Sequence, residues 1–289
     1  MNELLRLNNL RKVFPIRPSA SEPAHELVAV DDVSFSLAPG GSLAVVGESG
    51  SGKTTVARMV AGLETPTSGH IALNGKGRTA AHAGQRARKA QARDIQMVFQ
   101  DPYTSLDPKQ TVEAAIDEIL RAHFAWEAGR RQKRVAQLLD QVGLDQRQAA
   151  ARPRALSGGQ RQRAAIARAL ALEPRLLILD EAVAALDVSV QAQIINLLAD
   201  LRTETGVAFL FISHDLGVVR QVSDDCVVMH RGRVVEAGST TAILDNPQDD
   251  YTRTLLSALP RPGWVPRRRN VPEDAAPPIG NAQDAPISR

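Results

Sequence analysis

Cysteine, aromatic residues and long apolar runs are all scarce in this sequence. The single cysteine, Cys226, excludes a disulfide within the chain and a metal site built from several cysteines, and it fits a reducing compartment. Aromatic residues make up 3% of the 289 residues, so Leu, Val, Ile and Ala must fill the core that a hydrophobic content of 43% allows. No apolar run approaches the roughly 18–20 residues that cross a bilayer as a helix, and the first residues show no signal-peptide pattern. We therefore expect other chains to span the membrane if the protein works there.

An excess of charge of one sign is also missing. Lys and Arg number 35 and Asp and Glu 32, which gives a net charge of +3. The basic stretch 76–93 has no aromatic residues between its charges, whereas single-strand nucleic-acid sites combine the two. We interpret this stretch as a solvated loop or helix face and expect no nucleic-acid partner.

Short apolar strands alternate with helical patterns along most of the chain. This alternation predicts an α/β core with a largely parallel sheet. The helical pattern before the strand at 175–180 predicts an inserted helical subdomain. Strands are predicted at 28–37, 42–47, 175–180 and 207–213, helices at 53–63 and 189–206, and a hairpin at 226–238 that turns at Arg231-Gly232.

The stretch "GESGSGKT" (47–54) matches the phosphate-loop pattern G-x-x-x-x-G-K-[ST] in full. It follows a predicted strand and opens a predicted helix, as that motif requires. Its glycines allow backbone amides to point at phosphates, and the helix amino terminus adds partial positive charge. Lys53 is expected on the β- and γ-phosphates, and Thr54 is expected to offer its hydroxyl to Mg²⁺. The nucleotide contacts expected from this loop are Gly47, Glu48, Ser49, Gly50, Ser51, Gly52, Lys53, Thr54 and Thr55.

Two further stretches suggest phosphate chemistry. In "LLILDEAVAALD" (176–187) an apolar strand ends in two adjacent acids, Asp180 and Glu181. In "LSGGQRQR" (156–163) a serine and two glycines open a predicted helix and form a second possible anion site. Two phosphate sites so far apart in sequence can meet across a dimer. An ordinary serine cap before an Arg-rich helix is the alternative for the second site.

In this order, the motifs resemble those of the nucleotide-binding subunit of ABC transporters, over residues from about 14 to 238. The phosphate loop and the signature "LSGGQ" are present, and "LLILDE" resembles the Walker B strand. The remaining matches are "MVFQDP" (97–102) as Q-loop, "ALD" (185–187) as D-loop and "FISHD" (211–215) as switch-histidine motif.

The resemblance implies an α/β fold: a P-loop NTPase core with a mostly parallel sheet, an antiparallel β part at the amino terminus and an inserted helical subdomain. The implied ATP-binding domain is 1–260, with its helical subdomain at about 104–172. Residues 261–289 are rich in proline and lack apolar periodicity, which predicts a flexible tail. ATP and Mg²⁺ are the implied cofactors, and ATP hydrolysis coupled to transport is the implied reaction.

The resemblance also implies catalytic roles by position. Glu181 would polarise the attacking water as general base. His214 would contact the γ-phosphate. Asp180 would hold Mg²⁺ through water, together with Thr54. Gln100 would contact Mg²⁺ or the attacking water and link the site to the membrane partner.

Other implied contacts involve a second subunit and the base. Ser157, Gly158, Gly159 and Gln160 would contact nucleotide bound on the opposite subunit, and Asp187 would couple the two sites. Phe14 aligns with the aromatic residue that stacks on adenine. A buried core phenylalanine is the alternative for Phe14.

Three stretches resemble the oligopeptide/dipeptide importer branch of the family: "VFQDPYTSLDP" (98–108), "ALDVSVQAQIINLL" (185–198) and "NPQDDYTRTLLSALP" (246–260). The last lies in an implied C-terminal segment at about 238–260, where Asp249-Asp250 replace the His-Pro that is usual in the branch. The resemblance implies uptake of peptides or a related small solute at the cytoplasmic face of a bacterial membrane. The implied partners are a second ATPase subunit, two integral-membrane permeases and an extracytoplasmic solute-binding protein.

Two other classes are weighed against this one. A soluble ABC protein of DNA repair would separate the phosphate loop from the signature by long coiled coils, and no long heptad array lies between Lys53 and Ser157. Translation proteins of this type usually carry two cassettes, and this chain has one. A small-molecule kinase with a phosphate loop would have no use for "LSGGQ".

One motif departs from the family. Pro-Thr-Ser or Pro-Val-Ser commonly follows the catalytic glutamate, and this chain has Ala182-Val183-Ala184. Both acids remain, so we expect the loss of the proline to change stability by about 0.4–1 kcal/mol. Whether the altered turn tunes subunit pairing stays open at this point. The charges at the site are expected to be unchanged.

Overall fold

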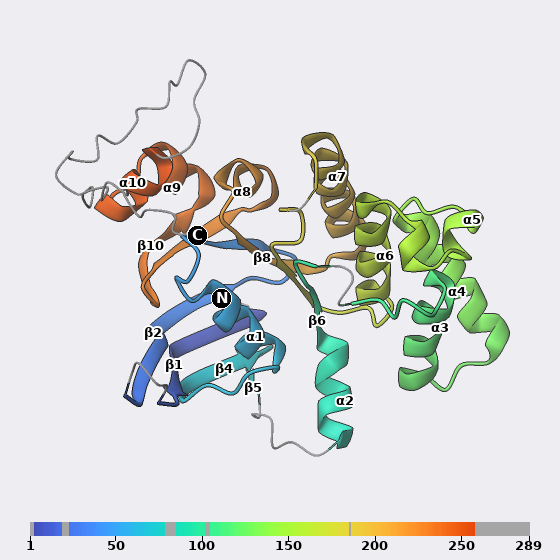
Figure 1. Cartoon of the computed structure of the whole chain (residues 1–289), viewed down its shortest axis with the longest axis horizontal. Coiled ribbons are helices and arrows are strands. Elements are labelled where there is room, and N and C mark those ends of the chain that lie inside the picture. Colours follow the sequence, from blue (N-terminus) through green and yellow to red (C-terminus); the bar gives the residue numbers. More distant parts are fainter. Residues whose placement is uncertain (1–2, 19–22, 79–84, 102–104, 185, 258–289) are drawn as a thin grey trace, which may run out of the picture.

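The computed structural model describes residues 3–18, 23–78, 85–101, 105–184 and 186–257. Two sheets and a lobe of helices make up this part of the chain (Figure 1). The predicted tail at 261–289 lies outside the described residues.

The smaller sheet is antiparallel and has the order β2-β1-β4-β5. It confirms the antiparallel β part at the amino terminus. Its strands are β1 (Leu5–Ile16), β2 (His25–Leu37), β4 (Ser68–Leu73) and β5 (Lys76–Gly77).

The larger sheet has the order β10-β9-β3-β8-β7-β6, and it is parallel from β9 to β6. Only β10 pairs antiparallel, in the predicted hairpin with β9. Arg231 and Gly232 at the turn have φ of 48° and 82°, the left-handed geometry of a tight hairpin. The strands are β3 (Ser42–Val46), β6 (Ile95–Val98), β7 (Leu176–Asp180), β8 (Ala208–Ser213), β9 (Asp225–His230) and β10 (Arg233–Ser239).

Helices cover the larger sheet and extend from it as a lobe (Figure 1). The lobe contains α3 (Val112–His123), α4 (Ala128–Gln141), α5 (Gln146–Ala149), the 3-10 helix η2 (Pro153–Ala155) and α6 (Gly158–Leu170), between β6 and β7 in the chain. The others are α1 (Lys53–Ala61), α2 (Gln85–Asp94), α7 (Val188–Thr205), α8 (Leu216–Val222), α9 (Thr240–Asp245) and α10 (Asp250–Ser257).

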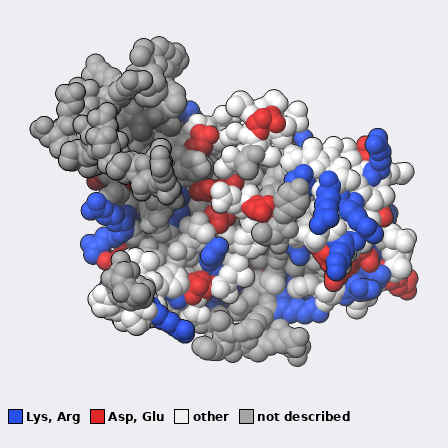
Figure 2. All heavy atoms as spheres, in the orientation of Figure 1, with Lys and Arg blue, Asp and Glu red and all other residues white. Residues whose placement is uncertain are grey.

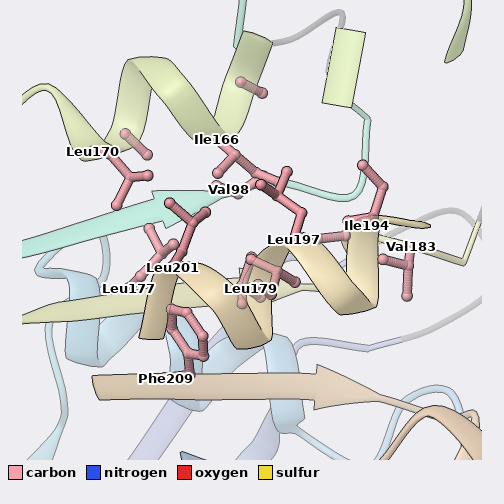
Figure 3. Close-up of a cluster of buried hydrophobic side chains, with 14 of the residues drawn as sticks. Val98, Ile166, Leu170, Leu177, Leu179, Val183, Ile194, Leu197, Leu201 and Phe209 are labelled. Carbon is pink, nitrogen blue, oxygen red and sulfur yellow. The ribbon is translucent and has the colours of Figure 1, made fainter. Parts of the chain in front are cut away.

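Strand β7 shows how the core is built. Side chains alternate along a strand, so Leu177 and Leu179 face a cluster with α6 and α7, while Leu176 and Ile178 face the cluster that contains α1. Figure 3 shows the first cluster, with Phe209 of β8 among aliphatic side chains. Burial on both faces explains why the central strands are continuous apolar runs.

Charges of both signs are mixed on the helical lobe. Figure 2 shows Lys and Arg interspersed with Asp and Glu over α3 to α6 on this face. No helix in the described part of the chain combines the length and the apolar character needed to cross a bilayer.

Candidate nucleotide-binding site

The carboxyl ends of three neighbouring parallel strands build the site. Val46 of β3 pairs with Ser213 of β8, and Asp180 of β7 pairs with Ile212 of β8. The residues after these strand ends therefore meet at one edge of the sheet, where ligands bind in open α/β folds. This edge brings together the phosphate loop, Glu181 and His214.

The phosphate loop is wedged between backbone segments of β2 and β9. A Cβ atom on Gly47 would lie 2.2 Å from the carbonyl oxygen of Met229, and one on Gly52 would lie 2.4 Å from that of Ala29. Both glycines also have positive φ, 148° and 100°. Only glycine fits at these two positions, which fixes the loop at the start of α1.

Lys53 is held inside the loop. It is 4% exposed, and its Nζ donates to the carbonyl oxygens of Gly47 at 2.8 Å and Glu48 at 2.7 Å. Burial lowers the pKa of Lys53, and the negative charges of Glu181 and Asp180 oppose that shift. The ammonium group thus lies in the loop that its sequence motif assigns to phosphates.

Thr54 and Asp180 form an oxygen pair beside the lysine. The Thr54 hydroxyl donates to Asp180 Oδ1 at 3.1 Å, and Asp180 is 5% exposed. Burial raises the pKa of Asp180, while the hydrogen bond from Thr54 acts in the opposite direction. Mg²⁺ favours a carboxylate, a hydroxyl and water, completed by substrate phosphates, so this donor set fits the ion. Among the described residues no group of three or more His, Cys, Asp or Glu could hold a metal alone.

Glu181 and His214 face each other across the edge. The Nδ1 atom of His214 lies 3.3 Å from Oε1 of Glu181. The Glu181 backbone has φ of 49°, and its amide donates to the carbonyl oxygen of Ile212 at 2.9 Å. A left-handed backbone at a non-glycine residue costs on the order of 1–3 kcal/mol and is concentrated at functional sites. The fold thus holds the Glu181 carboxylate beside His214 on a strained backbone.

A pocket of about 470 Å³ opens beside the loop. Phe14 of β1 lies half-buried in its lining with Thr54, Thr55 and Glu181, and it belongs to neither core cluster. The structure therefore places Phe14 where a base could stack, and the stacking itself stays a prediction.

Five residues of the lining were not among the expected site residues: Leu27, Val28, Ala29, Arg231 and Gly232. Leu27, which pairs with Phe14 across β1 and β2, is 51% exposed, and Val28 is 38% exposed. Arg231 at the hairpin turn also lines the pocket. The available signal was weak: exposed apolar residues on a strand opposite Phe14 become informative only once the strand register is known.

Gln100 follows the carboxyl end of β6, the strand that pairs with β7. It is exposed, two residues beyond β6, and the described lining of the 470 Å³ pocket does not include it. Its assigned contact with Mg²⁺ or water stays a prediction.

The signature residues form the amino terminus of α6. Ser157 and Gln160 make a reciprocal cap: Ser157 N–H donates to Gln160 Oε1 at 2.9 Å, and Gln160 N–H donates to Ser157 Oγ at 3.3 Å. The serine cap proposed as the alternative is thus present. It uses an acceptor lone pair of the hydroxyl and leaves the O–H free to donate, so capping and phosphate binding are compatible.

Asp187 and the signature meet through α7. The Asp187 carboxylate accepts from Val190 N–H at 2.9 Å and Ser189 Oγ at 2.8 Å, and these bonds lower its pKa. Gly159 packs so closely on Val190 that a Cβ would lie 2.4 Å from the valine side chain. None of the signature residues Ser157, Gly158, Gly159 and Gln160 is in the described lining of the 470 Å³ pocket.

The unusual turn after Glu181 is packed into the core. Ala182 and Val183 are 6% and 7% exposed, and Val183 contacts the α7 cluster (Figure 3). Ala184 N–H donates to the carbonyl oxygen of Glu181 at 3.1 Å. The apolar residues thus close the turn by burial, and both acids keep their places.

Comparisons with known proteins agree with this geometry. The ABC transporter family model matches residues 30–184. Glutathione import ATP-binding protein GsiA of Salmonella paratyphi A is 48% identical, and that of Shigella flexneri is 49% identical, over 89% of this chain. The chain spans 41% of the length of these relatives.

Solved cassettes share the fold. A dimeric ATP-binding cassette, MJ0796, in a post-hydrolysis state bound to ADP and Pi has a TM-score of 0.72 and 28% identity, over 82% of this chain and 98% of that one. The cbiO1 protein of Clostridium perfringens, part of the complex cbiONQ, has a TM-score of 0.73 and 26% identity, over 85% and 92%. The α/β fold with its antiparallel and parallel sheets is thus that of these cassettes, and the comparisons indicate ATP hydrolysis.

Proposed function

This chain belongs to the ABC transporter family, and we propose that it is the ATP-hydrolysing subunit of a bacterial importer that takes up peptides or a related small solute through partner permeases. The observation that carries the proposal is one edge of the sheet that presents Lys53, the Thr54–Asp180 pair and the Glu181–His214 pair together. The glutathione import relatives support a peptide-type solute, since glutathione is a small peptide.

In the proposed reaction Lys53 exchanges its loop carbonyls for the β- and γ-phosphate oxygens of ATP. Thr54 and Asp180 would hold Mg²⁺, which supplies positive charge to the phosphate oxygens when bound. Glu181 orients a water and accepts its proton as the water oxygen bonds to the γ-phosphorus. The bond from phosphorus to the leaving ADP oxygen breaks, and His214 stabilises the charge on the transferred group. Phe14, with Leu27 and Val28, would contact the adenine.

The remaining assignments concern the assembly. Ser157, Gly158, Gly159 and Gln160 would bind the γ-phosphate held by a second ATPase subunit, and Asp187 would couple the two sites. Gln100 would transmit the state of the site to the permeases. A solute-binding protein outside the membrane would deliver the solute, and this chain would lie on the cytoplasmic face.

We propose one ATP-binding domain followed by a tail. The ATP-binding domain is proposed to be 1–260, its helical subdomain about 104–172 and its C-terminal segment about 238–260. Residues 261–289 are proposed to be a flexible tail. Helices α3 to α6 lie between β6 and β7 in the chain, which supports the limits proposed for the helical subdomain.

Cell fractionation tests the importer assignment. The chain is expressed with and without the permeases of the proposed importer, and membranes are separated from the remaining extract. We expect the chain with the membranes only when the permeases are present. Recovery on ribosomes or DNA under both conditions would instead favour a soluble ABC ATPase of translation or DNA repair.

A further inference from the structure

The phosphate loop has a contact that its motif does not include. The backbone N–H of Glu48, the second residue of the loop, donates to the hydroxyl oxygen of Tyr251 at 3.1 Å. Tyr251 belongs to α10, which docks beside β10 at the end of the described chain (Figure 1). A helix far along the sequence therefore bonds directly to the nucleotide site.

The Glu48 residue is held on both sides. Its carbonyl oxygen accepts from Lys53 Nζ at 2.7 Å and from Ser51 N–H at 3.2 Å, while its N–H is held by Tyr251. The same lysine must turn to phosphates when a nucleotide binds. Two of these contacts do not involve Lys53, the bond from Ser51 N–H and the bond that Glu48 N–H donates to Tyr251, and they keep Glu48 in place while Lys53 changes partners.

Tyr251 is itself fixed by the core of the molecule. Its ring lies on that of His230, with centroids 3.9 Å apart and planes at 34°. The segment before it is clamped to β10, since the Glu236 carboxylate accepts from Gln248 N–H at 2.8 Å and Asp249 N–H at 3.2 Å. Asp249 Oδ1 in turn accepts from Tyr251 N–H at 2.8 Å. The hydroxyl therefore occupies a defined position.

We propose that Tyr251 is a positioning residue of the phosphate loop, through which docking of α10 and affinity for ATP are coupled. The proposal rests on the proposed function for its ligand. Because linkage is reciprocal, nucleotide in the loop stabilises α10 on β10, and release of α10 weakens nucleotide binding. The position of α10 then affects the phosphate loop through the hydrogen bond between Glu48 and Tyr251.

The test compares Tyr251→Phe with Thr254→Val. Phenylalanine keeps the ring on His230 and removes the acceptor. Thr254 is exposed on the same helix, and its hydroxyl donates to the carbonyl oxygen of Asp250 at 2.9 Å, so its variant removes a hydroxyl away from the loop. Two readouts are taken: ATP affinity with turnover, and exchange of the Glu48 amide hydrogen by NMR without nucleotide.

We expect Tyr251→Phe to weaken ATP binding roughly three- to tenfold, the range that one hydrogen bond covers, with kcat within about twofold of the wild type. Exchange of the Glu48 amide becomes faster, and Thr254→Val changes neither readout. Unchanged ATP affinity and unchanged Glu48 exchange in Tyr251→Phe would overturn the inference. Equal effects in the two variants would also overturn it, because they would reflect helix stability alone.

The two proposals fail in different ways. A wild-type chain that binds no ATP refutes the proposed function. The Glu48 exchange rate then decides the positioning role by itself, since it needs no nucleotide. If the wild-type chain binds ATP and Tyr251→Phe changes neither ATP affinity nor Glu48 exchange, the inference is refuted and the proposed function stands.

Discussion

The two acids at the end of β7, Asp180 and Glu181, are placed for chemistry rather than for stability. Asp180 is buried with a raised pKa, and Glu181 has a strained backbone, so neither is placed for stability of the nucleotide-free chain. Both make sense as groups held ready for a cation and a water. Two substitutions at this scale separate the roles.

Glu181→Gln removes the base and keeps the shape. We expect turnover of ATP to fall about 10²–10⁴-fold, the usual contribution of a general base, with ATP affinity within about twofold. Phosphate release and equilibrium binding measure the two quantities. Glu204→Gln, at an exposed position of α7, is the matched control. Near-normal turnover in the Glu181 variant would remove this residue from its role.

Asp180→Asn trades activity for stability. Burial raises the pKa of Asp180, so its ionised form destabilises the fold at neutral pH, and the destabilisation disappears as the pH falls below the raised pKa. Asparagine keeps an acceptor for Thr54 without the charge. We therefore expect Tm without nucleotide to rise, which thermal unfolding measures.

The same variant should lose about 100-fold or more of its Mg²⁺-dependent turnover. Asp200→Asn on the exposed side of α7 is the control and should change neither property. A lower Tm in Asp180→Asn would show that the carboxylate stabilises the fold, contrary to the account.

At the scale of elements, strand and helix ends were the easiest to predict. Helix α7 ends where Gly206 takes a left-handed cap with φ of 67°, as its sequence indicates. The acid pair, the loop and the histidine fell at one edge because parallel strands share their direction. The left-handed backbone of Glu181 was not predictable, because it depends on the pairing of its amide with Ile212 of another strand.

Contacts between distant elements also could not be predicted from local sequence patterns. The Tyr251–Glu48 bond and the exposed Leu27 and Val28 depend on how α10 and β2 dock, which no periodicity encodes. The burial of Val183 likewise depends on how the turn packs against α7. The sequence therefore predicts which reactive residues follow a strand, but it does not predict which distant elements pack against them.

Docking of α10 should depend on pH. Burial acts to raise the pKa of Glu236, but the amides of Gln248 and Asp249 and the charge of Arg253 hold it below its ordinary value of 4.5. A lowered pKa means that the stabilisation is complete above the ordinary value and is lost as the pH falls through the lowered one.

We therefore expect the NMR signals of the Gln248 and Asp249 amides to shift together below about pH 4.5. Glu236→Gln removes the titrating group and should abolish that shared transition. Persistence of the same transition in the variant would assign it to another carboxyl group.

At the scale of the whole molecule, the proposed importer would need two ATPase subunits. The signature residues of this chain are outside the described lining of the phosphate-loop pocket, and the solved cassette MJ0796 that resembles it is dimeric.

ATP-driven uptake is the most direct test of the central proposal. Membrane vesicles that contain the permeases and the solute-binding protein of the proposed importer are loaded with wild-type chain or with Glu181→Gln, on the face where ATP is supplied. Labelled glutathione and a labelled dipeptide serve as probes. We predict uptake of at least one probe that requires ATP and the wild-type chain and that is lost with Glu181→Gln. Equal uptake with both chains would contradict the account.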